Sequence, residues 1–356
     1  MLTHLIVPLD TTATSFCYYA NEGYAAGEPE FIPLDVLSQV VEYARAQDLS
    51  LNLLYGRTLP PAQHQSLIDA VAHVKIMPLA VQGVSDASVL VMNPDDDAAT
   101  VAQFGAAAPN LILRVQKERL PGLSGLVEKL ASQCQRMNVI LLGVDQYTDA
   151  DFNCYEGQLR ALCEALAQQM RQGHALELSC LTDRLTLRGM HNCDAGLSHL
   201  TVSPEGRFYV CPGFYYSSAD DSVGALDTGV AIGNRELLRL DHAPICCRCD
   251  AFHCKRCLFL NKLLTLEVNM PSHQQCVISH VEREASRQLL ESLRDLPSFR
   301  ELARIPRLDY LDPLEKVLPK PSSGATQRGD EELSDRELLW RIYDLQIEIL
   351  ARLRST

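Results

Sequence analysis

The chain has 356 residues, of which 47% are hydrophobic and 22% are charged, a composition typical of a folded globular protein and not of a disordered or fibrous one. Its length suggests two domains and an extension. The formal net charge of −13 argues against a nucleic-acid partner, because binding to phosphates needs a basic surface, and it is compatible with a neutral or cationic peptide.

From the N-terminus to about residue 187, short apolar runs alternate with amphipathic stretches. The alternation predicts an α/β domain whose parallel sheet is covered by helices, and it fits a doubly wound sheet as well as a partial barrel. We expect strands at 4–9, 51–55, 74–79, 88–92, 110–115, 138–144 and 175–180, and helices at 33–47, 61–74, 122–136 and 158–172.

After residue 188 glycines, turn residues and cysteines replace the long helical patterns. Residues 188–285 are therefore expected to form a small, loop-rich domain that cannot build a large core and needs bound metal to fold. Within it, polarity alternates on both sides of the segment SPEG at 203–206, where the positions of proline and glycine fit a type I turn. We predict a β-hairpin there.

Helical periodicity returns at residue 279 and continues through an extension over 286–319. Residues 320–333 are polar and typical of a flexible linker. Ser334 and Glu337 form a capping box that opens an amphipathic helix within 334–356. This helix packs back on its own chain in one interpretation and docks on a second protein in the other.

The thirteen cysteines are better explained by metal than by disulfides. The first residues, MLTHLIVPLDTT, lack the basic leader of a signal peptide, and no run approaches the roughly 18 apolar residues of a membrane span. We therefore expect a cytoplasmic protein with no membrane partner, in which thiols stay reduced.

The segment CCRCDAFHCKRC at 246–257 contains two Cys-x2-Cys pairs, a spacing at which a tight turn directs two thiolates to one metal centre. Zinc and iron-sulfur clusters both accept four thiolates, so spacing leaves the metal open. Cys134, Cys154 and Cys163 are expected to pack as small apolar side chains, and Cys247 is ambiguous. Eight cysteines are candidate ligands for two four-thiolate sites: Cys180, Cys193, Cys211, Cys246, Cys249, Cys254, Cys257 and Cys276.

The order of the cysteine motifs resembles the SPASM domain, which binds two [4Fe-4S] clusters at the C-terminal end of many radical SAM peptide-modifying enzymes. The resemblance rests on the pattern Cys193-x12-Gly206-x4-Cys211, followed by a long gap, the two Cys-x2-Cys pairs and a final Cys276. The resemblance implies that residues 1–187 form a partial (β/α)6 TIM-like barrel and that 188–285 form the iron-sulfur domain, with helices after it. It assigns an inner cluster to Cys180, Cys193, Cys211 and Cys257, and an outer cluster to Cys246, Cys249, Cys254 and Cys276.

The same resemblance implies a third cluster, which binds S-adenosylmethionine, at a Cys-x3-Cys-x2-Cys motif after the first strand. Here those three positions hold Asp10, Thr14 and Cys17, so one thiolate is present. The glycine-rich segment that would follow the second strand reads YGRT at 55–58. We therefore expect no conventional reductive cleavage of S-adenosylmethionine.

The run from Cys257 to Leu290 is most similar to the CXXX repeat peptide maturases, which share the altered first loop and are associated with small cysteine-repeat precursor peptides. The resemblance implies maturation of a ribosomally synthesised peptide, with two [4Fe-4S] clusters as cofactors. Two other functions stay open. One is a non-catalytic scaffold that presents the peptide to an active maturation protein, contacted through the C-terminal helix, and the other is a structural zinc protein.

Asp10 and Cys17 are also candidates for a different catalytic centre together with a nearby histidine. Both can ligate iron or zinc, and chemistry in barrel enzymes is found at the ends of strands. The alternative is that both belong to a structural loop. The histidines near the cysteines are expected to be surface residues or hydrogen-bond partners of ligands, not ligands themselves: His191, His199, His253, His273 and His280.

Overall fold

The computed structural model describes residues 2–81, 87–101, 110–174, 176–254 and 256–306, which belong to one compact unit, Met1–Leu308. Seven parallel strands are arranged in sequence order, so that each pairs with the next along the chain. They are β1 (His4–Pro8), β2 (Ser50–Leu54), β3 (His73–Pro78), β4 (Val89–Met92), β5 (Asn110–Val115), β6 (Arg136–Leu141) and β7 (Glu177–Leu178).

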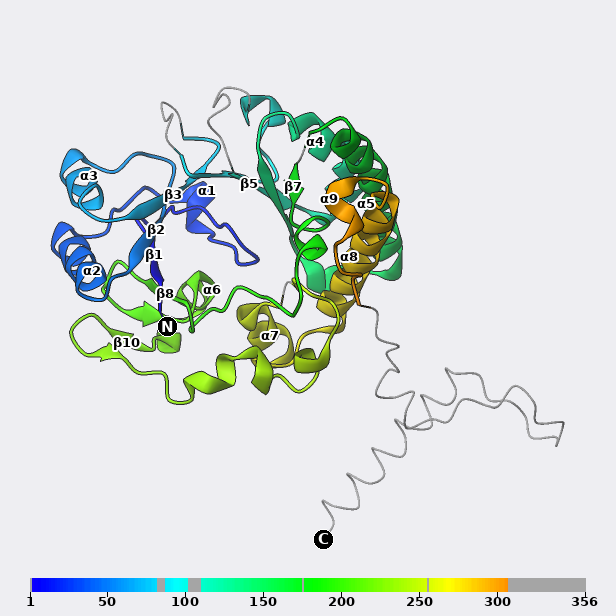
Figure 1. Ribbon diagram of the computed structural model, residues 1–356. Coiled ribbons are helices and arrows are strands. Elements are labelled where there is room, and N and C mark those ends of the chain that lie inside the picture. The colour runs from blue at the N-terminus through cyan, green and yellow to red at the C-terminus, as the bar shows by residue number, and fades with distance from the viewer. Residues whose placement is uncertain (1, 82–86, 102–109, 175, 255, 307–356) are drawn as a thin grey trace, which may run out of the picture. The chain divides into compact units, whose positions relative to one another are not determined.

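The sequential strand order decides between the two predicted α/β arrangements. A doubly wound sheet reverses its strand order at a switch point, whereas an order that never reverses, with right-handed crossovers, places all helices on one face. Figure 1 shows the sheet curving with the helices on its outer side, as in a partial TIM-like barrel. The predicted fold class is thus confirmed.

The helices that follow the strands match the predicted positions, with shifted ends. These helices are α2 (Leu34–Ala46), α3 (Ala62–Ile68), α4 (Leu123–Leu130) and α5 (Asp149–Arg171). A short helix, α1 (Gly23–Ala26), precedes them. Helix α5 begins earlier than expected because Thr148 and Asp151 form a capping box, in which the Thr148 N–H donates to Asp151 Oδ2 at 2.8 Å.

Alternate strand residues face opposite sides of the sheet, as the two-residue period of a strand requires. Leu5 and Leu53 belong to the main core, which includes the buried side chains of the helices. Ile6 and Leu54 belong to a second cluster, against which Phe16 of the loop after β1 is packed. This loop therefore covers the inner face of the curved sheet.

The predicted hairpin is present and extends the sheet beyond β1. Strand β8 (His199–Val202) pairs in parallel with β1, and β9 (Phe208–Tyr209) pairs with β8 in antiparallel orientation. In the turn, the Gly206 N–H donates to the Ser203 carbonyl at 2.9 Å, and Gly206 has a φ of 76°, which favours glycine. The start of the cysteine-rich region is thus joined to the barrel sheet.

The rest of the cysteine-rich region has short elements, as expected from its composition. Its longest described helix before residue 273 is α7 (Leu258–Thr265). The others are α6 (Pro212–Ser217), the strands β10 (Gly224–Ala225) and β11 (Gly229–Val230), and the 3-10 turns η5 (Ala219–Asp221), η6 (Arg235–Leu238), η7 (Leu240–His242) and η8 (Cys246–Arg248).

Helix α8 (His273–Ser292) packs against α5 on the outside of the sheet, followed by α9 (Pro297–Arg300) (Figure 1). It begins before the predicted residue 279 because Ser272 caps it, with the Ser272 Oγ accepting from the Gln275 N–H at 3.3 Å. The predicted linker at 320–333 and the helix at 334–356 lie outside the described residues.

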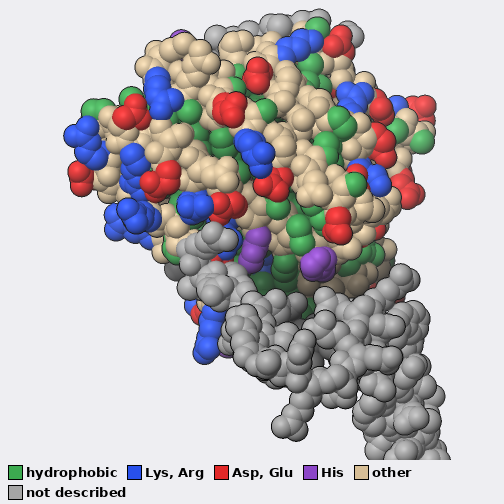
Figure 2. Space-filling view, turned by 90° about the vertical axis from the view of Figure 1, so that its right-hand side faces the viewer, with side chains coloured by type: hydrophobic (Ala, Val, Ile, Leu, Met, Phe, Trp, Pro, Cys, Tyr) green, Lys and Arg blue, Asp and Glu red, His purple; other side chains and the backbone are tan. Residues whose placement is uncertain are grey.

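The surface shows no dominant sign of charge on the face viewed in Figure 2, where acidic and basic side chains are interspersed. Among the helices that the structure describes, none combines the length and apolarity that crossing a bilayer requires.

Candidate metal centres

Four cysteines from four different segments line one cavity of about 180 Å³. Cys17 comes from the loop after β1, and Cys193 from the loop before β8. Cys211 is the N-cap residue of α6, and Cys257 is the N-cap residue of α7. Three of these four were predicted for the inner cluster, and Cys17 was not.

The rest of the cavity wall is mostly apolar, with a polar edge formed by the sheet. Its aromatic members include Phe16, Tyr19 and Phe259. The polar edge includes His4 and His199, which are partners in the register of β1 and β8 and stack with ring centroids 5.0 Å apart. Burial, followed by the charge of His4, lowers the pKa of His199 to about 4, so this edge is uncharged near pH 7.

The thiols in the cavity are held in their neutral form unless a cation is bound. Burial raises the pKa of Cys211 and, most strongly, of Cys257, and it also raises the pKa of the Cys193 thiol, although Cys193 as a whole residue is exposed. Backbone N–H groups oppose this shift, among them those of Ala195 toward Cys193 and Phe214 toward Cys211. A bound metal centre reverses the balance, because it deprotonates thiols that coordinate it.

The size of the cavity fits a polyatomic group. About 10–15 Å³ is enough for one water molecule, an order of magnitude less than the cavity of about 180 Å³. A single zinc ion would require all four sulfur atoms to move inward until each lay about 2.3 Å from the metal. Four thiols around a cavity of this size, with N–H groups directed at the sulfurs, therefore fit an iron-sulfur cluster well.

The four cysteines predicted for the outer cluster are also neighbours. Burial, followed by the charges of Cys254, Cys246 and Cys249, raises the pKa of Cys276 to about 12. The same combination of burial and neighbouring thiols raises the pKa of Cys246 to about 12. Cys247 is exposed, and its Sγ lies 3.6 Å from the Pro244 carbonyl oxygen.

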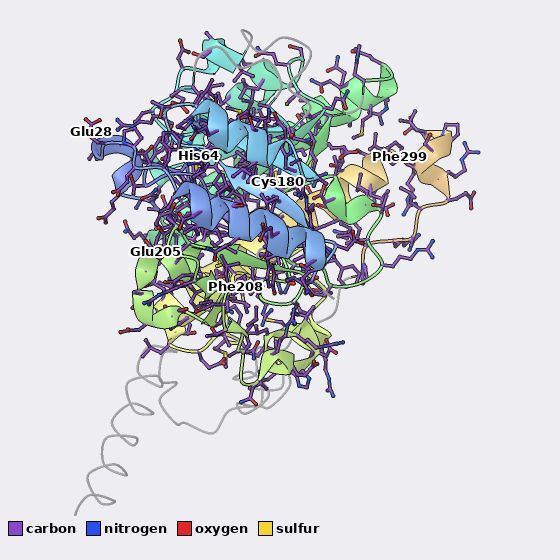
Figure 3. All side chains as sticks on the ribbon, turned by 90° about the vertical axis from the view of Figure 1, so that its left-hand side faces the viewer. Glu28, His64, Cys180, Glu205, Phe208 and Phe299 are labelled. Carbon is purple, nitrogen blue, oxygen red and sulfur yellow. The ribbon has the colours of Figure 1, made fainter. Side chains whose placement is uncertain are left out.

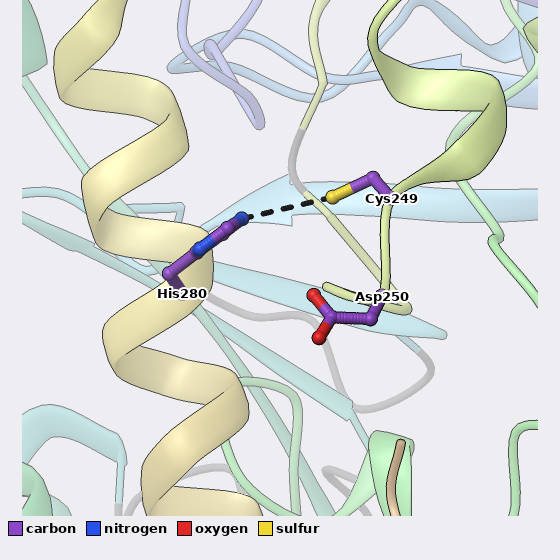
Figure 4. A group of neighbouring side chains, drawn as sticks. All are labelled: Cys249, Asp250 and His280. Atoms are coloured by element: carbon purple, nitrogen blue, oxygen red, sulfur yellow. Dashed lines mark hydrogen bonds between the residues drawn. The ribbon is translucent and has the colours of Figure 1, made fainter. Parts of the chain in front are cut away.

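A histidine and a carboxylate accompany the outer cysteines. Ligand atoms of Cys249, Asp250 and His280 lie within 4.8 Å of one another, and His280 Nε2 is 3.7 Å from Cys249 Sγ (Figure 4). Arg283 Nη1 donates to Asp250 Oδ1 at 2.5 Å. The sequence prediction treated His280 only as a possible neighbour, although its position four residues after Cys276 on α8 puts both on one helix face.

Cys180, which was predicted for the inner set, is not among the described residues that line the cavity. It is fully buried in the main core, and its carbonyl oxygen accepts from Arg184 Nη1 at 2.9 Å. Figure 3 shows Cys180 well away from the hairpin residues Glu205 and Phe208. Cys180 ends an apolar run of the sequence and packs as part of it, and its place among the cluster ligands stays a prediction.

Asp10 and Cys17, the candidates for a separate catalytic centre, lie in different surroundings. Asp10 is buried, and its Oδ1 accepts from both the N–H and the hydroxyl of Thr12 at 2.6 Å. Gly56 approaches so closely that a Cβ there would lie 2.2 Å from Asp10 Oδ1. Burial raises the pKa of Asp10, opposed by the Thr12 hydrogen bonds. Asp10 is not among the cavity-lining residues that the structure describes.

Other histidines predicted near the cysteines have their own partners. His253 Nε2 lies 2.9 Å from Asp183 Oδ2, and His191 stacks on His253 at 6.3 Å. His273 is exposed at the start of α8. These residues lie beside the cysteine region without joining either thiol set.

No protein-family model and no curated protein sequence matches the chain. Among solved structures, native anSMEcpe with bound AdoMet and Cp18Cys peptide superposes with a TM-score of 0.57 at 11% identity, over 83% of this chain and 100% of that one. Polyhistidine-tagged anSMEcpe with bound AdoMet superposes with a TM-score of 0.56 at 11% identity, over 84% of this chain and 97% of that one. Native anSMEcpe with bound AdoMet and Kp18Cys peptide superposes with a TM-score of 0.57 at 12% identity, over 83% of this chain and 99% of that one. The chain therefore shares the fold of these structures across most of its length.

Proposed function

We propose that this protein takes part in maturing a small, ribosomally synthesised precursor peptide, as an iron-sulfur protein of the radical SAM/SPASM type. The observation that carries the proposal is the four-cysteine cavity on the inner face of the barrel, in a fold shared with a structure that holds AdoMet and a peptide. Ile6, which faces the inside of the sheet, is part of the cavity wall, so the cavity opens on the barrel interior.

The proposed cofactors are two [4Fe-4S] clusters. The inner set would be held by Cys193, Cys211 and Cys257 with a fourth ligand, and the outer set would be held by Cys246, Cys249, Cys254 and Cys276. Such clusters supply one-electron transfer and can order a small domain. The protein's own part is to bury the sulfurs, to direct backbone N–H groups at them and to shape an apolar cavity.

The proposed peptide is a cysteine-repeat precursor, as in the CXXX repeat group that the run from Cys257 to Leu290 resembles. The net charge of −13 suits a neutral or cationic peptide better than an acidic one. The apolar wall with Phe16, Tyr19 and Phe259 would shield the inner cluster from water.

A scaffold without catalysis of its own is a second candidate, favoured by the loop after β1. Two of the three positions that would hold the S-adenosylmethionine cluster are Asp10 and Thr14, neither of which is a thiolate. Both are engaged within the fold, since Asp10 binds Thr12 and the Thr14 N–H donates to the Tyr55 carbonyl at 2.9 Å. In this alternative the chain presents the peptide to a separate maturation protein.

Zinc at the outer site is a third candidate, favoured by the close grouping of Cys249, Asp250 and His280. These three residue types are ordinary zinc ligands. Elemental analysis after anaerobic purification separates the metals: two cubanes predict about eight irons and eight labile sulfides per chain with absorbance near 400 nm. A preparation with zinc alone would contradict the proposed function.

Co-expression of the full chain with a cysteine-repeat peptide tests the function itself. Mass spectrometry of the peptide is expected to show a mass change that depends on the intact inner cysteines. A peptide that binds the chain but changes mass only after a second protein is added would favour the scaffold. Pull-downs with chains that end at residue 333 or 356 would then test contact through the C-terminal segment.

A further inference from the structure

The loop that carries Cys17 is fixed to the barrel on both sides of the cysteine. Before it, the Thr14 N–H donates to the Tyr55 carbonyl, which directly follows β2, at 2.9 Å. After it, the Tyr19 carbonyl accepts from Arg114 Nη2 of β5 at 3.0 Å. With anchors three residues before and two residues after Cys17, its thiol has a defined position on the inner face of the sheet.

The same loop is fixed to the cysteine-rich region by aromatic stacking. Tyr19 stacks on Tyr216 of α6, with ring centroids 5.5 Å apart and planes inclined by 16°. Cys211 is the N-cap residue of that helix. The contact therefore holds the loop of Cys17 against the element that carries Cys211.

The four thiols of the proposed inner centre surround one space. All four cysteines line the same cavity of about 180 Å³. The cavity thus has a thiol from each of four separate segments of the chain.

We propose that Cys17 supplies the fourth thiolate of the inner iron-sulfur centre, together with Cys193, Cys211 and Cys257. This inference rests on the proposed function in one respect, the presence of iron-sulfur clusters. The loop after β1 then serves to attach the inner centre to the barrel wall and does not hold a cluster of its own.

The rival fourth ligand, Cys180, would require the main core to open. Cys180 is fully buried, and beside it Arg184 forms an ion pair of 2.8 Å with Glu282, in which both side chains are completely buried. Tyr155 donates to the other oxygen of Glu282 at 2.7 Å. Moving Cys180 to the cavity would disrupt this network, whereas Cys17 already lines the cavity.

Single substitutions test the assignment in anaerobically reconstituted full-length protein, through iron and labile sulfide per chain and the EPR spectrum after dithionite reduction. C17A is expected to lower iron from about eight to about four per chain, or to retain it with an altered inner-centre spectrum that responds to added 2-mercaptoethanol. Either result places Cys17 on the cluster. C180A is expected to keep the wild-type iron content and spectrum.

Two further variants separate ligation from folding. C154A replaces another half-buried cysteine, on α5, and is expected to match wild type in all measurements. C17S retains the size and polarity of the side chain, and is expected to change the EPR spectrum while the far-UV circular dichroism stays unchanged.

The assignment is overturned if C17A and C17S both retain wild-type iron, sulfide and EPR spectra with no response to 2-mercaptoethanol. Loss of the inner centre in C180A alone would overturn it in favour of the rival ligand. Wild-type protein that takes up no iron would refute the proposed function instead, and that result is read from the wild type before any variant is compared.

Discussion

The inner and outer cysteine sets place four thiols each in contrasting surroundings. The inner set encloses an apolar cavity and takes its members from the loop after β1 and from the cysteine-rich region. The outer set lies among polar side chains, where His280 faces Cys249 and the Ser279 hydroxyl lies 3.2 Å from Cys254 Sγ. Apolar and polar surroundings are expected to give the two centres different reduction potentials, because hydrogen bonds to the sulfurs and solvent exposure tune a cluster.

The two sets also differ in their attachment to the barrel. The inner set is connected through the paired strands β1 and β8 and through the Cys17 loop. The outer set is connected through α8, which carries Cys276 and packs on α5. Perturbing one attachment is therefore expected to affect one set more than the other, and the predictions below use this difference.

The largest effect is expected from removing one ligand of each set. C257A should eliminate the inner centre and C254A the outer centre, so that each lowers iron from about eight to about four per chain. Their EPR spectra after reduction should be complementary and should sum to the wild-type spectrum. Identical spectra for the two variants would show that the eight thiols do not form two independent centres.

The attachment of α8 is tested by E282A. This substitution leaves Arg184 buried without its partner and removes the acceptor for Tyr155, so the free energy of unfolding should fall by about 3–5 kcal/mol. The outer centre should become labile before the inner one. Chemical denaturation and iron release against time provide the measurements.

The matched control lies on the same helix. Glu284 pairs with Arg287 at 2.5 Å, but both side chains are partly exposed, at 29% and 35%. E284A should therefore cost less than about 1 kcal/mol. Equal destabilisation by E282A and E284A would mean that the buried pair does not attach α8.

The polar edge of the inner cavity should make the protein sensitive to acid. Burial, then the charge of His4, lowers the pKa of His199 from 6.5 to about 4, so the unfolded chain takes up this proton first as the pH falls. The free energy of unfolding is therefore highest above pH 6.5 and decreases toward pH 4, by on the order of 3 kcal/mol.

Denaturant unfolding at about pH 7.5 and about pH 4.5, on either side of the ordinary histidine pKa, measures the loss. H199L removes the titrating group and should flatten the difference between the two pH values, while H273L, which replaces an exposed histidine on α8, should leave it unchanged. An acid sensitivity that persists in full in H199L would assign it to other groups.

The smallest effect is expected from H280A. A hydrogen bond to a cluster sulfur stabilises the reduced, more negative state, so removing the His280 ring should lower the reduction potential of the outer centre. The expected shift is on the order of 50 mV, close to a tenfold change for a one-electron couple. Potentiometric EPR titration measures it, and the potential of the inner centre, which His280 does not line, should remain constant.

Much of the fold followed from local patterns in the sequence. Apolar runs located the parallel strands because a strand buried on both faces has few polar residues. The SPEG turn located the hairpin, since proline and Gly206 fit its backbone angles. Helix ends were less predictable: the helix expected at 122–136 merged α4 with the first residue of β6, because the residues between them, 131–135, include no proline or glycine to mark the helix end.

The sequence by itself determined the class of fold and the proximity of Cys246, Cys249 and Cys254, because the spacing within 246–257 is a local property that a turn converts directly into proximity. Only the tertiary structure brought Cys17 to the cavity that Cys193, Cys211 and Cys257 also line. Cys17 reaches the cavity because strand β1 pairs with β8 and Tyr19 stacks on Tyr216, contacts between residues far apart in the chain. Cys180 packs in the main core and is not among the described residues that line this cavity.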